Sequence, residues 1–286
     1  MPPLHRRLSR KLAAAARGWL ADPAPPRHPD QERFIYPRLN ALVEETAAAL
    51  GATQRPQYTW GLAHAAYLAQ QLGIPRMAAL ELGVAGGKGL VALDRAADWV
   101  EGALGVAIEV HGFDSGQGLP RPADVRDLPN LWAAGDFPMD QAALAGRLRR
   151  ARLHLGLVER EIPTFLQTQP PPIGFISFDL DLYSSTVASF PLLLAAPDRL
   201  LPRVQCYFDD ILGFTFAEFN GERLAIREFN AAHATRQISP IFGARHYVPP
   251  RYAAAIWVDK LYMAHILDHP RYNDYDGLVL RPRLDL

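Results

Sequence analysis

The chain has 286 residues, of which 49% are hydrophobic and 21% charged, which is enough to bury one large core. Thirty Lys and Arg residues balance thirty Asp and Glu residues, and this net charge of zero argues against nucleic acid as a partner, because neutralising phosphates takes a cationic excess. Cys206 is the only cysteine, so an internal disulfide and a thiolate-rich zinc or iron–sulfur centre are excluded, and a reducing compartment such as the cytoplasm is expected.

Residues 1–30 are expected to form a basic arm and a proline-rich linker ahead of one domain at 31–286. The first 21 residues contain no acid, and their basic residues are Arg6, Arg7, Arg10, Lys11 and Arg17. A solvated helix is favoured over an organellar transit peptide, and the arm is a candidate segment for forming a homo-oligomer. No apolar run approaches the roughly 18 residues of a membrane-spanning helix, so no membrane partner is expected.

Short apolar runs alternate with helical periodicity along the rest of the chain, as they do in consecutive strand–helix units of a parallel sheet. Strands are predicted at residues 77–82, 106–113, 152–157, 173–178, 204–208 and 253–258. Helices are predicted at residues 37–50, 61–72, 88–101, 141–150, 184–194, 222–232 and 261–268. This pattern indicates a doubly wound α/β domain, whose ligands bind at the carboxyl ends of the strands.

A glycine-rich turn, Glu81-Leu-Gly-Val-Ala-Gly-Gly-Lys-Gly89, joins the first of these strands to the next helix. Its glycines allow a tight turn and a close approach of the backbone to a ligand. Lys88 is followed by glycine instead of Ser or Thr, so the turn is not a P-loop, and Ala85 departs from a dinucleotide fingerprint. Glu81 can pair with a cationic amino group. The alternative is an ordinary strand-to-helix turn.

An acidic residue, Asp114, ends the following strand in the loop Gly112-Phe-Asp-Ser-Gly-Gln-Gly-Leu-Pro120. In Rossmann-like folds an acid at this point hydrogen-bonds ribose hydroxyls, so Asp114 is a candidate ribose ligand. The alternative is a turn-forming aspartate in a loop rich in glycine and proline.

Two aspartate clusters follow the next two strands, in the segments Phe178-Asp-Leu-Asp-Leu-Tyr-Ser-Ser-Thr186 and Tyr207-Phe-Asp-Asp-Ile211. Neighbouring buried carboxylates repel one another, and hard oxygen ligands suit Mg²⁺ or Mn²⁺. Asp179, Asp209 and Asp210 are the predicted ligands. Asp181 either shares the face of Asp179 or caps the helix that begins near Ser184. The alternative for the tandem pair is a role in surface caps and turns.

These motifs together resemble the class I S-adenosylmethionine-dependent methyltransferases, and most closely the metal-dependent macrocin O-methyltransferase family. The resemblance covers residues 55–230 and implies a Rossmann-like doubly wound sheet of about seven strands with an N-terminal helical extension. It implies that Glu81, Gly83 and Gly87 bind the methionine and ribose parts of S-adenosylmethionine, that Asp114 meets the ribose and that Gly156 lies near the adenine. It also implies that Asp179, Asp209 and Asp210 act in catalysis through bound Mg²⁺ or Mn²⁺.

The implied reaction is metal-assisted O-methylation of a small hydroxylated molecule, a sugar or a secondary metabolite. The metal favours the ionised acceptor oxygen, and alignment of the two reactants supplies much of the acceleration. Antibiotic-modifying members of the family carry a histidine base after a Gly-Asp step, whereas Gly135-Asp136 is followed here by Phe137. Asp136 or Asp140 is the expected substitute, unless the metal alone suffices.

Two other functions fit parts of the sequence. A metal-dependent glycosyltransferase would use Asp179-x-Asp181 to hold the metal of a nucleotide-sugar, but it leaves the glycine turn unused. A cofactor-binding domain without catalysis would explain the missing histidine. The aromatic residues Tyr58, Trp60 and Tyr67 are expected either to form a lid over the substrate or to pack in the core.

Overall fold

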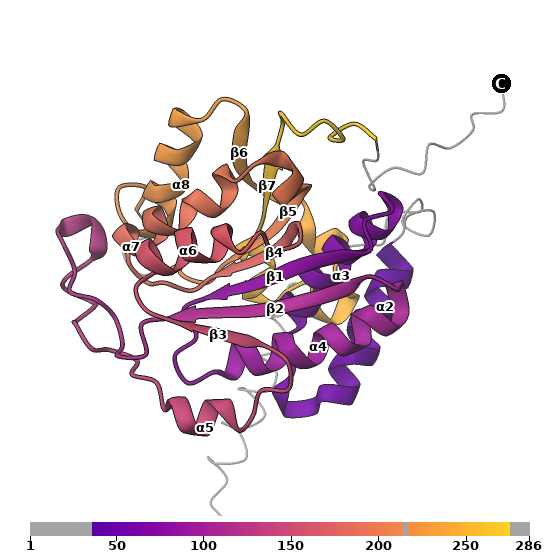
Figure 1. Ribbon diagram of the computed structural model, residues 1–286, viewed down its shortest axis with the longest axis horizontal. Helices are drawn as coiled ribbons and strands as arrows, with labels where there is room; N and C mark the ends of the chain where they lie inside the picture. Colours follow the sequence, from indigo (N-terminus) through magenta and orange to yellow (C-terminus); the bar gives the residue numbers. More distant parts are fainter. Residues whose placement is uncertain (1–35, 214–216, 275–286) are drawn as a thin grey trace, which may run out of the picture.

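The computed structural model describes residues 36–213 and 217–274, which contain one seven-stranded sheet (Figure 1). The order of the strands is β3-β2-β1-β4-β5-β7-β6, and β7 runs in the opposite direction to the other strands. The strands span Arg76–Leu82 (β1), Ala107–Asp114 (β2), Arg152–Leu155 (β3), Ile173–Phe178 (β4), Leu200–Phe208 (β5), Arg236–Pro240 (β6) and Leu261–Ile266 (β7). The prediction of a doubly wound, Rossmann-like α/β fold is confirmed.

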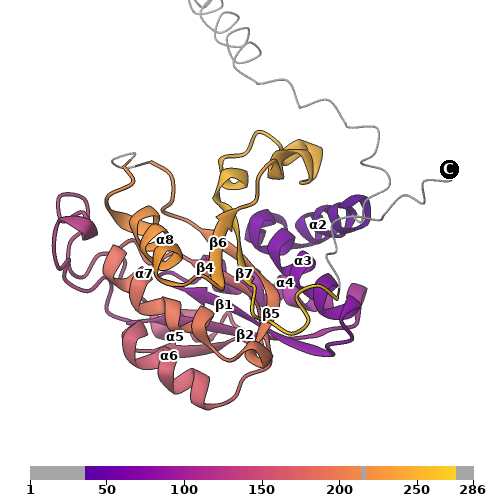
Figure 2. The ribbon, with the colours of Figure 1, turned by 90° about the horizontal axis from the view of Figure 1, so that it is seen from above.

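Helices cover both faces of this sheet (Figure 2). One face carries α2 (Tyr36–Leu50), α3 (Pro56–Gln71) and α4 (Lys88–Leu104), and the other carries α6 (Val158–Gln167), α7 (Tyr183–Ser189) and α8 (Gly221–Ala232). The short α5 (Gln141–Ala145) precedes the edge strand β3. Each layer buries its own apolar core against the sheet, centred on residues such as Leu62 and Leu90 on one side and Ile162 and Phe229 on the other. None of the helices in these residue ranges is long and apolar enough to cross a membrane.

The predicted secondary structure is wrong for two segments near the C-terminus. Residues 261–268, predicted as a helix, contain β7, and residues 253–258, predicted as a strand, lie between and within the 3₁₀ turns Pro250–Tyr252 and Ile256–Lys260. A short apolar run such as that of β7 is compatible with a buried strand as well as with a helix, which explains the first error. The consecutive prolines Pro249 and Pro250 favour a turn ahead of residues 253–258, which explains the second. The prediction also omitted β6 and α6. The expected arm at residues 1–30 lies outside the described residues.

Two predicted helices are shorter than expected. The segment at 141–150 is helical only as far as Ala145, and the segment at 184–194 divides into α7 and the 3₁₀ helix Phe190–Leu194. Pro191 explains the second difference, because proline lacks the amide that would continue the α-helical hydrogen bonds.

Backbone hydrogen bonds continue beyond the strand ends and fix the loops that follow β1, β2, β4 and β5. Gly83 N donates to Phe113 O, Asp179 N to Leu82 O, and Asp209 N to Phe178 O, each at 2.9 Å. The loops that carry the glycine turn and the aspartate clusters therefore begin side by side at one edge of the sheet.

Candidate functional site

The side chain of Asp114 holds the glycine turn by accepting hydrogen bonds from backbone amides of the turn. One carboxylate oxygen accepts hydrogen bonds from Val84 N and Ala85 N, both at 2.8 Å, and the other accepts from Gly116 N at 2.7 Å. Gly156 lies beside it, because Gly156 N donates to Asp114 O at 2.9 Å. These predicted residues therefore lie together at the ends of β1, β2 and β3.

Gly83 and Gly87 meet different neighbours. A Cβ on Gly83, whose φ is +82°, would lie 1.7 Å from the carbonyl oxygen of Asp179, so this glycine lets the loops after β1 and β4 touch. Gly87, at φ +75°, precedes α4, and a Cβ there would meet a methyl group of Leu144 at 2.2 Å. Gly83 therefore joins the two halves of the site, whereas Gly87 packs against α5.

Glu81 is buried beneath the turn. Its carboxylate accepts a hydrogen bond from the Tyr58 hydroxyl at 2.9 Å, and that hydroxyl accepts one from Ser177 Oγ at 2.9 Å. Burial raises the pKa of Glu81 above its usual range, and the charge of Asp179 adds to the shift. Tyr58 and Trp60 are 1% and 2% exposed, so both belong to the core instead of a lid.

Asp179, Asp209 and Asp210 come together as predicted, and each offers a carboxylate oxygen within 4.8 Å of the others. Asp209 accepts hydrogen bonds from the Tyr207 hydroxyl at 2.9 Å and from Lys260 Nζ at 3.2 Å. Asp210 accepts one from Asp181 N at 3.0 Å, and its own amide donates to Glu222 at 2.9 Å. The side chains of Asp209 and Asp210 are thus held by these groups, and Glu222 fixes the backbone at Asp210.

The charges of these aspartates are poorly compensated by the chain itself. Burial, followed by the charges of Asp209 and Asp210, raises the pKa of Asp179 to about 8, and burial with its acidic neighbours raises the pKa of Asp210 to about 8. Glu222 is buried behind them, and its Oε1 has no hydrogen-bond partner in the described part of the chain. A divalent cation would relieve this repulsion, and three carboxylate oxygens are the donor set that Mg²⁺ or Mn²⁺ prefers.

Asp181 lies in a strained turn. Its φ is +60°, and Leu182 N donates to Leu180 O at 2.6 Å, which closes a γ-turn around it. The idea that Asp181 caps the next helix is wrong, because Ser184 N and Ser184 Oγ donate to Asp127 instead, at 2.7 and 2.9 Å. The turn leaves Asp181 in the wall of the cavity beside Asp210.

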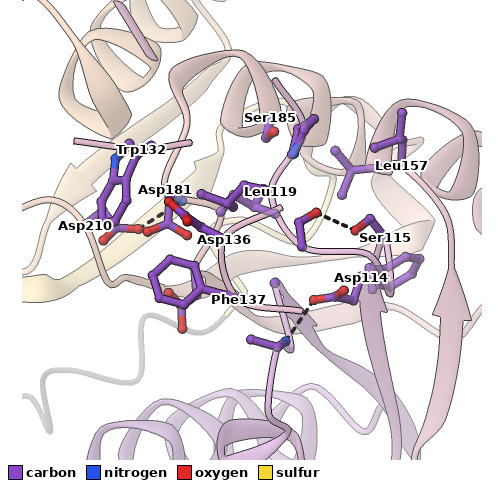
Figure 3. A pocket seen from close by; sticks show the side chains of 18 of the residues that line it. Asp114, Ser115, Leu119, Trp132, Asp136, Phe137, Leu157, Asp181, Ser185 and Asp210 are labelled. Atoms are coloured by element: carbon purple, nitrogen blue, oxygen red, sulfur yellow. Dashed lines mark hydrogen bonds between the residues drawn. The ribbon is translucent and has the colours of Figure 1, made fainter. Parts of the chain in front are cut away.

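A single cavity of about 370 Å³ connects the glycine turn with the aspartates (Figure 3). Gly83, Ala85, Asp114 and Gly156 line one part of it, and Asp179, Asp181, Asp209 and Asp210 line another. The loop between β2 and α5 supplies a wall that includes Leu119, Trp132, Asp136 and Phe137. Glu81 and Gly87 support the turn from outside this lining.

Sequence reasoning missed several residues of the site. Trp132, Phe137, Ser185 and Glu159 line the cavity, while Glu222 and Lys260 contact the aspartates. The two aromatic residues had a signal in the sequence, since large apolar side chains are unusual in a loop rich in glycine, proline and aspartate. Lys260 had no such signal in the sequence, because the secondary structure on both sides of it was predicted wrongly and its place beside Asp209 could not be inferred.

No family model and no curated protein matches the sequence. Among solved structures, the chain is similar to the calicheamicin methyltransferase CalS11, with a TM-score of 0.49 and 23% identity over 78% of this chain and 96% of that one. It is also similar to the O-methyltransferase NovP, with a TM-score of 0.44 and 15% identity over 59% and 69% of the two chains. A Bacillus cereus O-methyltransferase in complex with SAH gives a TM-score of 0.37 and 18% identity over 88% and 97%.

Proposed function

We propose that this protein is an S-adenosylmethionine-dependent methyltransferase that methylates a hydroxyl group of a small molecule with the assistance of Mg²⁺ or Mn²⁺. One observation carries the proposal: the glycine turn with Asp114 and the three aspartates line the same cavity. A cofactor at the turn and an acceptor at the aspartates would therefore be neighbours, and holding two reactants in line can supply about 7 to 11 kcal/mol of the barrier.

Gly83, Asp114 and Gly156 are the residues that would hold the cofactor, with Glu81 and Gly87 supporting the turn. When bound there, S-adenosylmethionine would supply the methyl group of its sulfonium for transfer to the acceptor oxygen. Asp114 keeps the turn open for the ligand, because it fixes the amides of Val84 and Ala85. Phe113 and Leu157 line the same part of the cavity and exclude water from it.

Asp179, Asp209 and Asp210 would hold the metal, which when bound lowers the pKa of an acceptor hydroxyl. Lys260 and Tyr207 orient Asp209, and Glu222 orients the loop at Asp210. Asp136 lines the cavity, whereas Asp140 caps α5 by accepting a hydrogen bond from Ala143 N at 3.0 Å. Asp140 is thus not the base, and the metal alone would favour loss of the acceptor's proton.

The glycosyltransferase alternative fits the cavity less well. A nucleotide-sugar carries a diphosphate, and the cavity lining contains several carboxylates but no Lys, Arg or His within the described residues. A glycosyltransferase would also have no use for the glycine turn that Asp114 holds in place. A binding domain without catalysis predicts the same ligands and no methyl transfer.

Calorimetric titration with S-adenosylmethionine and S-adenosylhomocysteine, in Mg²⁺ and then in EDTA, tests the proposal. We expect dissociation constants on the order of micromolar for both ligands, and little dependence on the metal. Failure of both to bind would exclude the methyltransferase function and favour the glycosyltransferase.

Asp210→Asn tests the metal site separately. We expect the substitution to weaken Mg²⁺ binding by about ten-fold or more, because it removes one charged ligand, and to leave S-adenosylhomocysteine affinity within about three-fold of the original. Asp98→Asn, which removes an exposed carboxylate on α4, is the matched control for net charge. Unchanged Mg²⁺ affinity in Asp210→Asn would contradict the ligand set.

A further inference from the structure

The cavity has an unusual balance of charge. Seven carboxylates line it, and the lining includes no Lys, Arg or His within the part of the chain that the structure describes; the seven are Asp114, Asp136, Glu159, Asp179, Asp181, Asp209 and Asp210. A divalent metal and S-adenosylmethionine, which carries a sulfonium and an ammonium against one carboxylate, bring only three net positive charges. Lys260, which pairs with Asp209 from outside the lining, adds a fourth positive charge. Seven ionised carboxylates therefore keep an excess of negative charge when the metal and S-adenosylmethionine are both bound.

The metal and the glycine turn leave three carboxylates unused: Asp136, Asp181 and Glu159. Glu159 lies in the first turn of α6, shortly after Gly156 at the cofactor end, so Asp136 and Asp181 are the two considered for the acceptor. The carboxylate of Asp136 accepts one hydrogen bond, from Ala133 N at 2.8 Å, through a single oxygen. Within residues 36–213 and 217–274 no group donates a hydrogen bond to the carboxylate of Asp181. Figure 3 shows both residues near Asp210 and apart from Asp114, so they lie at the acceptor end of the cavity.

Two aromatic rings accompany these carboxylates. The rings of Trp132 and Phe137 lie 5.9 Å apart at an angle of 62°, and both line the cavity. Phe137 stays 50% exposed and has a φ of +60°, an uncommon backbone conformation for a bulky residue. Aromatic faces attract cations, and rings placed beside carboxylates are a common means of binding organic ammonium groups.

Taking the proposed function as its basis, we propose that the acceptor is a hydroxylated molecule that carries a protonated amine. Asp136 and Asp181 bind the ammonium group, the rings of Trp132 and Phe137 border it, and the reacting hydroxyl faces Asp179, Asp209 and Asp210. Acceptors with a phosphate or carboxylate are rejected by the same charges. Asp136 and Asp181 are then residues that determine specificity.

Three catechols that differ only in the charge of one substituent test this inference: dopamine, 4-methylcatechol and 3,4-dihydroxyphenylacetate. Their binding is measured by calorimetry with the full chain, Mg²⁺ and S-adenosylhomocysteine present. We expect dopamine to bind about ten-fold more tightly than 4-methylcatechol, and the anionic catechol to bind more weakly than either. Equal affinities, a tighter fit of the anion, or no binding of dopamine would overturn the proposal.

Asp136→Asn and Asp181→Asn show which residues cause the preference. Asparagine keeps an oxygen for Ala133 N, so Asp136→Asn removes the charge and preserves the loop contact. We expect each variant to reduce the preference for dopamine by about three-fold or more, and Asp98→Asn to retain it. A preference that survives both substitutions would contradict the assignment.

The affinity for S-adenosylmethionine separates this inference from the function on which it depends. If the two variants bind S-adenosylmethionine as the original chain does, the carboxylates serve the acceptor. If they lose S-adenosylmethionine as strongly as dopamine, the carboxylates bind the cofactor's own ammonium group and the inference is wrong. Absence of S-adenosylmethionine binding in the original chain would instead refute the methyltransferase function itself.

Discussion

Gly83 is the residue at which the loop after β1 touches the loop after β4. Its positive φ and the nearby carbonyl of Asp179 both require a residue without a side chain. In the same turn, Gly86 has open space around the position of a Cβ. Both glycines belong to the same turn, yet only Gly83 contacts the backbone of Asp179, an expected metal ligand.

Gly83→Ala is therefore expected to lower the free energy of unfolding by about 3 kcal/mol or more, because it combines backbone strain with a clash against backbone atoms. Gly86→Ala is the matched control and should change the stability by less than about 1 kcal/mol. Urea unfolding of both variants measures the difference. Similar stabilities of the two variants would show that the contact at Gly83 is not needed.

At the scale of elements, the cavity depends on how the loop between β2 and α5 is anchored. Asp127 is 1% exposed and accepts hydrogen bonds from Ser184 N, Ser184 Oγ and Ala123 N, so it fastens this loop to the start of α7. The loop also closes on itself, since Leu119 N donates to Asp136 O and Gly135 N donates to Leu119 O. These contacts place Trp132, Asp136 and Phe137 in the cavity wall.

We expect Asp127→Ala to cost about 2 to 3 kcal/mol of stability and to speed amide hydrogen exchange over residues 115–140, because three hydrogen bonds to a buried carboxylate are lost. Asp124→Ala removes a carboxylate that is 44% exposed and pairs with Arg126, so its effect on stability should be much smaller. Hydrogen exchange read by mass spectrometry compares the two. Equal exchange of the loop in both variants would argue against Asp127 as its anchor.

The sequence predicts those parts of the site that follow parallel strands. Asp114 ends one of them, Asp179 and Asp209 directly follow two others, and such strand ends meet at one edge of the sheet whatever the rest of the chain does. Lys260 reaches Asp209 only because β7 inserts antiparallel between β5 and β6, and no local pattern encodes that insertion. The positions of Trp132 and Phe137 likewise depend on the contact between their loop and the start of α7. That contact joins Asp127 to Ser184, which are 57 positions apart in the sequence.

At the scale of the whole molecule, the helical layer of α6, α7 and α8 buries imidazoles as well as apolar groups. His111 on β2 is 2% exposed, and its Nδ1 lies 3.0 Å from Nε2 of His154. The ring of Phe165, from α6, packs against His111 at 4.8 Å. Glu109 is the only acid within 4 Å of His111 among the described residues, at 3.7 Å.

This burial predicts a loss of stability in acid. Burial, followed by the charges of His154 and Arg152, lowers the pKa of His111 to about 3, while the unfolded chain titrates near 6.5. Between these values the unfolded chain binds more protons, so the contribution of His111 is complete above pH 6.5 and falls as the pH falls towards 3. From pH 7 to pH 4.5 we expect a loss on the order of 2 to 3 kcal/mol from this residue.

His111→Asn removes this titration and keeps a polar group facing His154. Asparagine is expected to lower the stability at pH 7, because it fills less of the space beside Phe165. Between pH 7 and pH 4.5, however, the variant should lose about 2 kcal/mol less than the original chain, as measured by urea unfolding at each pH in EDTA. A parallel decline of both proteins would mean that His111 takes up its proton as readily in the folded protein as in the unfolded chain, and would contradict the lowered pKa.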